Sequence, residues 1–192
     1  NLVMYMKLLI PFILKRADAV VVPSLYVKNE IKKRYNTNGN KIEVIYGGQD
    51  TYFHEVKERK KINLLKNKYG ISEAYCFTNA TNHERKNIYG LIDAFVKIDK
   101  VAQYQLIMTG LLPEKTIEEL KVYIHRLGFD KKIKYLGFVS KEDLCTLYSG
   151  AKIFVFPSFE EGFGFPILES AACGCLPICS DTGSLPEIIG NK

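Results

Sequence analysis

The sequence lacks an apolar run long enough to cross a bilayer. Residues 1–14 are apolar apart from Asn1 and Lys7, and the uncharged run after Lys7 is far shorter than the roughly 20 residues that a spanning helix needs. A signal peptide is disfavoured, because the basic pair Lys15-Arg16 lies where a cleavage region should be neutral. We therefore expect an amphipathic or buried helix here. Position 1 is not Met, so we also expect a fragment of a longer protein.

The chain also lacks a regular set of paired cysteines. Its five cysteines form an odd set, and no histidine follows Cys173, Cys175 and Cys179 at the spacing of a zinc finger. We interpret them as free thiols that pack as small apolar side chains. Free thiols fit a reducing, cytoplasmic location.

Basic residues are concentrated in the first third of the chain. Residues 1–70 contain 14 Lys and Arg against 6 Asp and Glu, whereas the whole chain has a net charge of +6. This excess predicts either an anionic partner, such as a membrane surface or a phosphorylated acceptor, or simply a solvated helix face. Beyond net charge, nothing indicates nucleic-acid recognition.

Predicted strands and helices alternate along nearly the whole chain. The expected strands are apolar runs at residues 19–22, 42–46, 75–79, 104–108, 133–136, 153–156 and 176–179. The expected helices cover residues 24–35, 59–69, 86–97, 114–127 and 141–148, with two more beginning at residues 166 and 184. This alternation predicts an α/β fold with a doubly wound parallel sheet. Ligands bind beyond the carboxyl ends of such strands, so the loops after Asn79, Met108, Phe156 and Cys179 are candidates.

The most informative segment follows the strand expected at residues 153–156. Glu161 and Glu169 flank a Gly-Phe-Gly-Phe-Pro turn, and Pro166 is suited to the first residue of a helix. The unpaired N–H groups at such a helix start favour an anion, most often phosphate. A phosphate with a carboxylate on either side fits a ligand that has hydroxyls at both ends of a diphosphate, such as a nucleotide sugar. The alternative is ordinary turn chemistry, with acidic side chains stabilised by the helix dipole.

The segment resembles the donor-binding signature of the retaining glycosyltransferases of group 1, also called family 4. The matching residues are Pro157, Ser158, Glu161, Gly162, Phe163, Gly164, Pro166, Glu169, Ala172, Gly174, Pro177, Gly183, Pro186 and Glu187. Residues 42–53 resemble the hinge between the two domains of these enzymes. Residues 79–87 resemble their first phosphate-binding loop, which ends here in Arg85-Lys86-Asn87 as in mannosyltransferase-like members, although Ala80 and Thr81 replace the customary glycine and arginine.

The resemblance implies the GT-B arrangement of two Rossmann-like domains facing a cleft. Residues 1–54 would be the tail of the amino-terminal acceptor domain and the hinge. Residues 55–192 would be the carboxy-terminal domain that binds the nucleotide sugar, truncated at its C-terminal end. We therefore expect a hexosyltransferase whose isolated chain binds nucleotide weakly.

The resemblance also implies roles for individual residues. Glu161 would contact the transferred sugar, and Glu169 would bind the ribose hydroxyls. Lys86 and Arg85 would neutralise the departing diphosphate, since positioned cations stabilise charge that develops in a transition state. The remaining donor-binding positions would be Gly162, Phe163, Gly164, Thr81 and Asn82.

The family normally needs no metal, and the sequence has no Asp-x-Asp motif. No cofactor is expected beyond the nucleotide sugar, for which Arg85-Lys86-Asn87 favours GDP-mannose over a UDP-sugar. The expected acceptor is a carbohydrate or lipid-linked glycan of surface polysaccharide synthesis, with peripheral contact at the inner membrane face through the basic amino-terminal stretch. Two alternatives are a binding module without catalysis and a two-domain sugar-nucleotide epimerase, against which the spacing of Glu161 and Glu169 argues.

Overall fold

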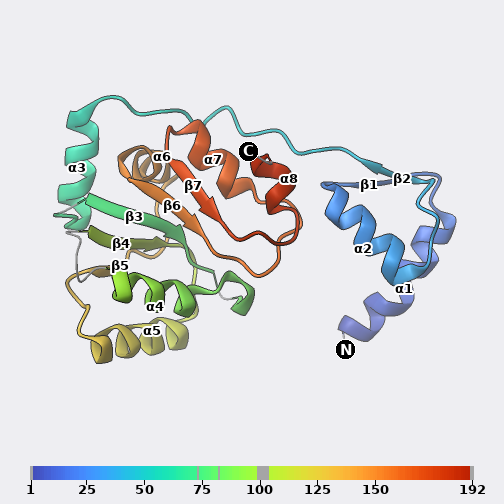
Figure 1. Ribbon diagram of the computed structural model, residues 1–192, viewed down its shortest axis with the longest axis horizontal. Coiled ribbons are helices and arrows are strands. Elements are labelled where there is room, and N and C mark those ends of the chain that lie inside the picture. Colours follow the sequence, from blue (N-terminus) through green and yellow to red (C-terminus); the bar gives the residue numbers. More distant parts are fainter. Residues whose placement is uncertain (1, 73, 82, 99–103, 191–192) are drawn as a thin grey trace.

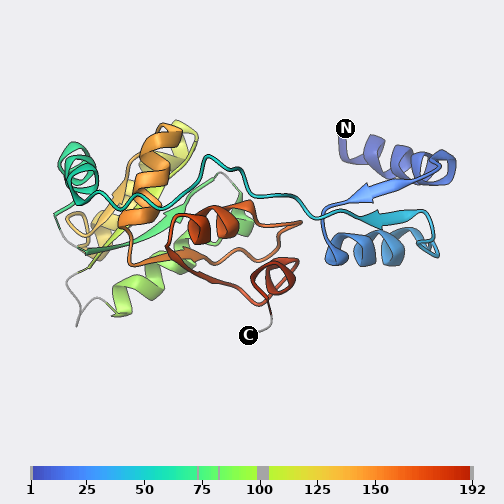
Figure 2. The same ribbon diagram turned by 90° about the horizontal axis from the view of Figure 1, so that it is seen from above.

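The computed structural model describes residues 2–72, 74–81, 83–98 and 104–190. The chain forms a small amino-terminal part and a larger part (Figure 1). The extended segment after β2 (Ile42–Val44) runs along the larger part to reach α3 (Arg59–Tyr69) at its far end, and Figure 2 shows this link from above. The carboxy-terminal helix α8 (Leu185–Ile189) lies on the side of the larger part that faces the small part.

The small part contains one parallel strand–helix–strand unit. Strand β1 (Val20–Val22) pairs with β2, and α2 (Leu25–Tyr35) connects them. The Ser24 hydroxyl caps α2 by accepting a hydrogen bond from the Val27 amide at 3.2 Å. The expected helix at the amino terminus is present as α1 (Leu2–Arg16). None of the helices among the described residues is both long and apolar enough to span a bilayer.

The larger part contains one five-stranded sheet with the order β5-β4-β3-β6-β7, in which every pair of neighbours is parallel. The strands are β3 (Ala74–Asn79), β4 (Tyr104–Thr109), β5 (Ile133–Tyr135), β6 (Ile153–Phe156) and β7 (Leu176–Cys179). After β5 the chain returns to the other side of β3, so the strand order reverses between β3 and β6. Ligands bind at such a switch point in open α/β sheets.

Helices cover both faces of this sheet, as predicted. Side chains of α3, α6 (Lys141–Gly150) and α7 (Phe165–Ala172) pack on one face, with Tyr75, Phe77 and Phe154 from the strands. Side chains of α4 (Ile88–Ile98) and α5 (Glu114–Leu127) pack on the other. Since neighbouring strand residues point to opposite faces, the continuous apolar strands supply both cores.

Most expected elements agree with the structure to within two residues, with two informative differences. Residues 84–86 form a separate 3-10 turn, η1 (Glu84–Lys86), so Lys86 does not begin α4 as predicted. Helix α7 begins at Phe165 with Gly164 as its cap, which makes Pro166 the second residue instead of the first. None of the five cysteines forms a disulfide, and Cys145, Cys173 and Cys175 are buried.

Candidate active site

The candidate site lies where the loops after β3 and β6 meet, at the carboxyl ends of the two strands that flank the switch point. The Phe159 amide donates a hydrogen bond to the Arg85 carbonyl at 2.7 Å, which joins the two loops directly. Residues predicted separately from each loop are therefore neighbours in space, although 75 positions separate Lys86 from Glu161.

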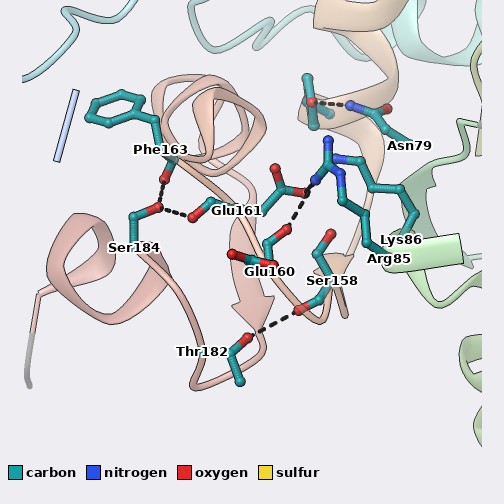
Figure 3. A network of polar contacts seen from close by, with 10 residues as sticks. Asn79, Arg85, Lys86, Ser158, Glu160, Glu161, Phe163, Thr182 and Ser184 are labelled. Carbon is teal, nitrogen blue, oxygen red and sulfur yellow. Dashed lines mark hydrogen bonds and ion pairs between the residues drawn. The ribbon is translucent and has the colours of Figure 1, made fainter. Parts of the chain in front are cut away.

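A buried charge cluster occupies this junction. Oxygen Oε1 of Glu161 lies 2.7 Å from Lys86 Nζ and 2.5 Å from the Arg85 guanidinium (Figure 3). Lys86 and Glu161 are each only 8% exposed, whereas the Arg85 side chain is 42% exposed. Lys86 Nζ also lies 4.3 Å from the centre of the Phe156 ring, a cation–π contact. The cluster has two positive charges and one negative charge, so an additional anion would be attracted to it.

The surroundings shift the pKa values of both buried groups. Burial disfavours the ionised carboxyl of Glu161, but hydrogen bonds from Arg85 and Lys86 outweigh it and hold the pKa of Glu161 below its ordinary value. Burial lowers the pKa of Lys86, and the hydrogen bond to Glu161 offsets this only in part. A carboxylate bound to two cations is consequently the preferred state of Glu161.

Local backbone geometry brings Lys86 into this cluster. Asn87 adopts a left-handed conformation with φ of +52°, which ends η1 and separates it from α4. The Lys86 side chain is buried and lies outside α4, so it is not an exposed residue at a helix start. Glu161 provides a charge partner for Lys86 within the chain.

The backbone of the loop that contains Glu161 is held by two buried serines. The Ser184 hydroxyl lies 2.9 Å from the carbonyl oxygens of both Glu161 and Phe163, and the Ser184 amide donates to the Glu161 carbonyl at 3.1 Å (Figure 3). The Ser24 hydroxyl donates to the Gly162 carbonyl at 2.7 Å. Sequence reasoning assigned no site role to either serine, because these contacts connect positions 23 and 138 residues apart.

The same loop leads into α7 with its amides free. Gly164, with φ of +108°, precedes the helix and provides no side-chain cap. Within the described part of the chain, the amides of Gly162, Phe163 and Gly164 donate no hydrogen bond. These N–H groups, at the positive end of the α7 dipole, can bind an anion.

Glu169 lies in the second turn of α7, apart from the cations. The Tyr148 hydroxyl donates to Glu169 Oε2 at 3.1 Å and accepts from the side-chain Nδ2 of Asn79 at 3.0 Å. The Thr109 hydroxyl in turn donates to the Asn79 side-chain oxygen at 3.2 Å. Burial raises the pKa of Glu169, and the hydrogen bond from Tyr148 offsets this only in part. One carboxylate oxygen of Glu169 therefore retains its acceptor capacity for a ligand.

The structure describes Ala80 and Thr81 of the predicted phosphate-binding loop. Thr81 lines a cavity of about 500 Å³ with Glu84, Asn87 and Tyr89, and its buried hydroxyl has no partner among the described residues. Asn82 lies outside the described residues. Ala80 is fully buried against the α4 side of the sheet.

A second cavity separates the two parts of the chain. Its volume is about 430 Å³, and it is lined by Tyr26, Ile31 and Arg34 of α2 and by Arg85 and Glu161 of the charge cluster. A molecule in this cavity would contact both parts and would lie beside the Glu161 carboxylate.

Two family models match the chain: the group 1 glycosyl transferases over residues 80–192 and glycosyltransferase family 4 over residues 2–53. O-antigen chain mannosyltransferase B from Escherichia coli is 40% identical over 121 residues, which are 62% of this chain and 32% of that protein. The serotype-specific mannosyltransferase WbdA from Escherichia coli is 30% identical over 190 residues, which are 97% of this chain and 23% of that protein. The matched segments thus cover only 32% and 23% of these two relatives.

Among solved structures, Anabaena Alr3699/HepE in complex with UDP and glucose superimposes with a TM-score of 0.85. The match covers 97% of this chain and 50% of that protein at 21% identity, so it supports the fold alone.

Proposed function

The chain belongs to the group 1 glycosyltransferases, and from this premise we propose that it is part of an enzyme that transfers a hexose from a nucleotide sugar with retention of configuration. Residues 55–192 are the donor-binding domain in this proposal. Residues 1–54 are the tail of the acceptor domain and the hinge.

The observation that supports this proposal best is the charge cluster at the switch point. Lys86 and Arg85 converge on one carboxylate oxygen, so the cluster retains excess positive charge beside the free amides of residues 162–164. A diphosphate would bring the negative charge that this arrangement lacks. As it departs, its charge increases, and cations already in position stabilise that change without reorganisation.

The carboxylates then have separate functions. Glu161, displaced from the cations by the diphosphate, accepts hydrogen bonds from hydroxyls of the transferred sugar. Glu169 accepts from the ribose hydroxyls, supported by Tyr148. Thr81 and Asn82 extend the contact with the phosphates. Glu161 is hydrogen-bonded to Lys86 and Glu169 to Tyr148, and these separate positions support separate roles for the two acids.

The reaction breaks the bond between the anomeric carbon and the diphosphate oxygen. A new bond forms to an acceptor hydroxyl oxygen on the same face of the sugar, and the hydroxyl proton is released. We expect no metal requirement, because Arg85 and Lys86 supply positive charge next to the leaving group.

We propose GDP-mannose as the donor and a carbohydrate or lipid-linked glycan of a surface polysaccharide as the acceptor. The Arg85-Lys86-Asn87 sequence and the mannosyltransferase names of the two relatives support this choice. The cavity between α2 and the charge cluster suits the acceptor. A cytoplasmic reaction at the inner membrane face, with the basic amino-terminal stretch toward the lipid, completes the proposal.

Titration of the chain with GDP, UDP, GDP-mannose and UDP-glucose tests the donor assignment by calorimetry and by thermal shift. We expect GDP and GDP-mannose to bind and to raise the unfolding temperature as their concentration increases. A preference for UDP would change the donor, and no response to any nucleotide would refute the proposal. Transfer by the full-length protein, measured with and without Glu161→Ala, separates an enzyme from an inactive binding module.

A further inference from the structure

Helix α2 of the small part begins against the loop that contains Glu161, and every N–H group of its first turn has a partner. The Val27 amide donates to the Ser24 hydroxyl, and the Lys28 amide donates to the Ser24 carbonyl at 3.1 Å. The amides of Leu25 and Tyr26 donate to the two carboxylate oxygens of Glu187 at 3.0 and 2.9 Å. Half of this cap therefore comes from α8 of the larger part.

Two tyrosine hydroxyls strengthen this contact between the small part and the larger part. The Tyr46 hydroxyl donates to Glu187 Oε2 at 3.0 Å. The Tyr26 hydroxyl donates to Glu160 at 2.8 Å, and this hydrogen bond raises the pKa of Tyr26 to about 12. A carboxylate at a helix N-terminus is stabilised by the helix dipole as well as by its hydrogen bonds. Glu187 thus fixes the start of α2, where Ser24 lies, on the larger part.

The Ser24 hydroxyl also donates a hydrogen bond to the loop of the candidate site. Its hydroxyl is fully buried, accepts from Val27, and donates its only proton to the Gly162 carbonyl at 2.7 Å. Ser184 holds the carbonyls on either side, those of Glu161 and Phe163. Three successive carbonyls are therefore held by two serines, one from each part of the chain.

This arrangement determines where the free amides point. The N–H of a residue is opposed to the carbonyl of the residue before it, because the peptide unit is planar and trans. Holding the Gly162 carbonyl toward Ser24 therefore turns the Phe163 amide away from Ser24. In the same way, Ser184 turns the amides of Gly162 and Gly164 away from itself. Loss of the Ser24 contact would allow the central peptide to rotate.

We propose that Ser24, held in place by Glu187, is a positioning residue for nucleotide binding: the small part of the chain fixes the loop on which the larger part binds its ligand. This inference rests on the proposed function. Ser24 touches no reacting atom; it acts through the Gly162–Phe163 peptide. Nucleotide affinity consequently depends on a residue outside the donor-binding domain.

Calorimetric titration with GDP and UDP tests this in the whole chain. We expect Ser24→Ala to weaken binding of the preferred nucleotide about fivefold, the value of one typical hydrogen bond. Ser24→Thr keeps both the cap and the donor, so it should bind like the wild type. Glu187→Gln has one acceptor oxygen instead of two and should fall between them. Ser170→Ala is the matched control, since it removes another buried hydroxyl that donates to a carbonyl, Ile167 O at 2.8 Å, within α7.

Backbone NMR chemical shifts of residues 162–164 provide a second measurement that needs no ligand. We expect Ser24→Ala to shift the resonances of the Gly162 carbonyl and the Phe163 amide, because the carbonyl loses its hydrogen bond and the peptide can rotate, and Ser24→Thr and Ser170→Ala to leave both close to the wild type. Equal nucleotide affinity and unchanged shifts at these two positions in Ser24→Ala and wild type would overturn the inference. If the wild type binds neither nucleotide, the proposed function fails. In that case unchanged shifts in Ser24→Ala refute the positioning contact as well, and altered shifts retain it.

Discussion

Replacing Glu161 by Gln removes the charge that Lys86 and Arg85 share without changing the size of the side chain. This carboxylate forms ion pairs with both cations, which the proposed diphosphate would also need. We therefore expect Glu161→Gln to destabilise the free chain and, at the same time, to increase its affinity for a nucleoside diphosphate. An improvement in binding is an unusual expectation for a residue in a candidate active site.

The magnitudes follow from burial. Removing one partner of a buried ion pair costs about 3–5 kcal/mol. Gln retains an acceptor oxygen and water reaches Arg85, whose side chain is 42% exposed, so we expect a loss of about 2–3 kcal/mol in unfolding free energy. Like charges about 6 Å apart in a partly buried site repel by about 3 kcal/mol before screening. Relief of roughly half of this repulsion corresponds to about tenfold tighter binding of GDP or UDP.

The measurement is calorimetric titration of wild type and Glu161→Gln with GDP, UDP and their sugar nucleotides, together with urea unfolding. The gain should be larger for the nucleotide than for the sugar nucleotide, because the variant also loses a sugar contact. Glu160→Gln is the matched control: it makes the same change one residue away, at an exposed carboxylate that contacts Tyr26. If Glu161→Gln binds the nucleotide no more tightly than wild type, the carboxylate does not compete with the phosphate and the reasoning fails.

Three further outcomes are expected. The pKa of Glu161 is lowered in the folded chain. The wild type should therefore be more stable than Glu161→Gln above about pH 4.5, and this difference should disappear as the pH falls below that value; equal acid unfolding profiles would contradict this. The pKa of Glu169 is raised, so Glu169→Gln should stabilise the chain at pH 7 by up to about 1 kcal/mol and weaken nucleotide binding about tenfold, as calorimetry can show. A side chain at Gly183 (φ +61°) would lie 2.8 and 2.9 Å from backbone atoms of Glu161, whereas one at Gly128 (φ +76°) meets no atom within 4 Å. Urea unfolding should therefore show that the unfolding free energy falls by about 1 kcal/mol in Gly128→Ala and by at least about 3 kcal/mol in Gly183→Ala. Equal losses would show that the loop that contains Glu161 moves to make room for the added side chain.

The sequence alone determined the α/β class, most element boundaries and the identity of the two candidate loops. These features depend on local chemistry. Ser24 and Ser140 cap α2 and α6 by bonding to the amide three residues onward, and Gly70 and Gly128 adopt the left-handed conformation that ends α3 and α5. Such signals lie within a few residues of their effect, so a single sequence contains them.

Only the tertiary structure decided how the loops meet and which charges are neutralised. The position of η1 depends on Asn87, and the burial of Lys86 against Phe156 and Glu161 depends on β6 lying next to β3. Local patterns contain no information about strand order, because that order is decided by the packing of both faces of the sheet. The contact between Ser24 and Gly162 is a further case: the two residues are 138 positions apart and meet where α2 contacts Glu187 of α8.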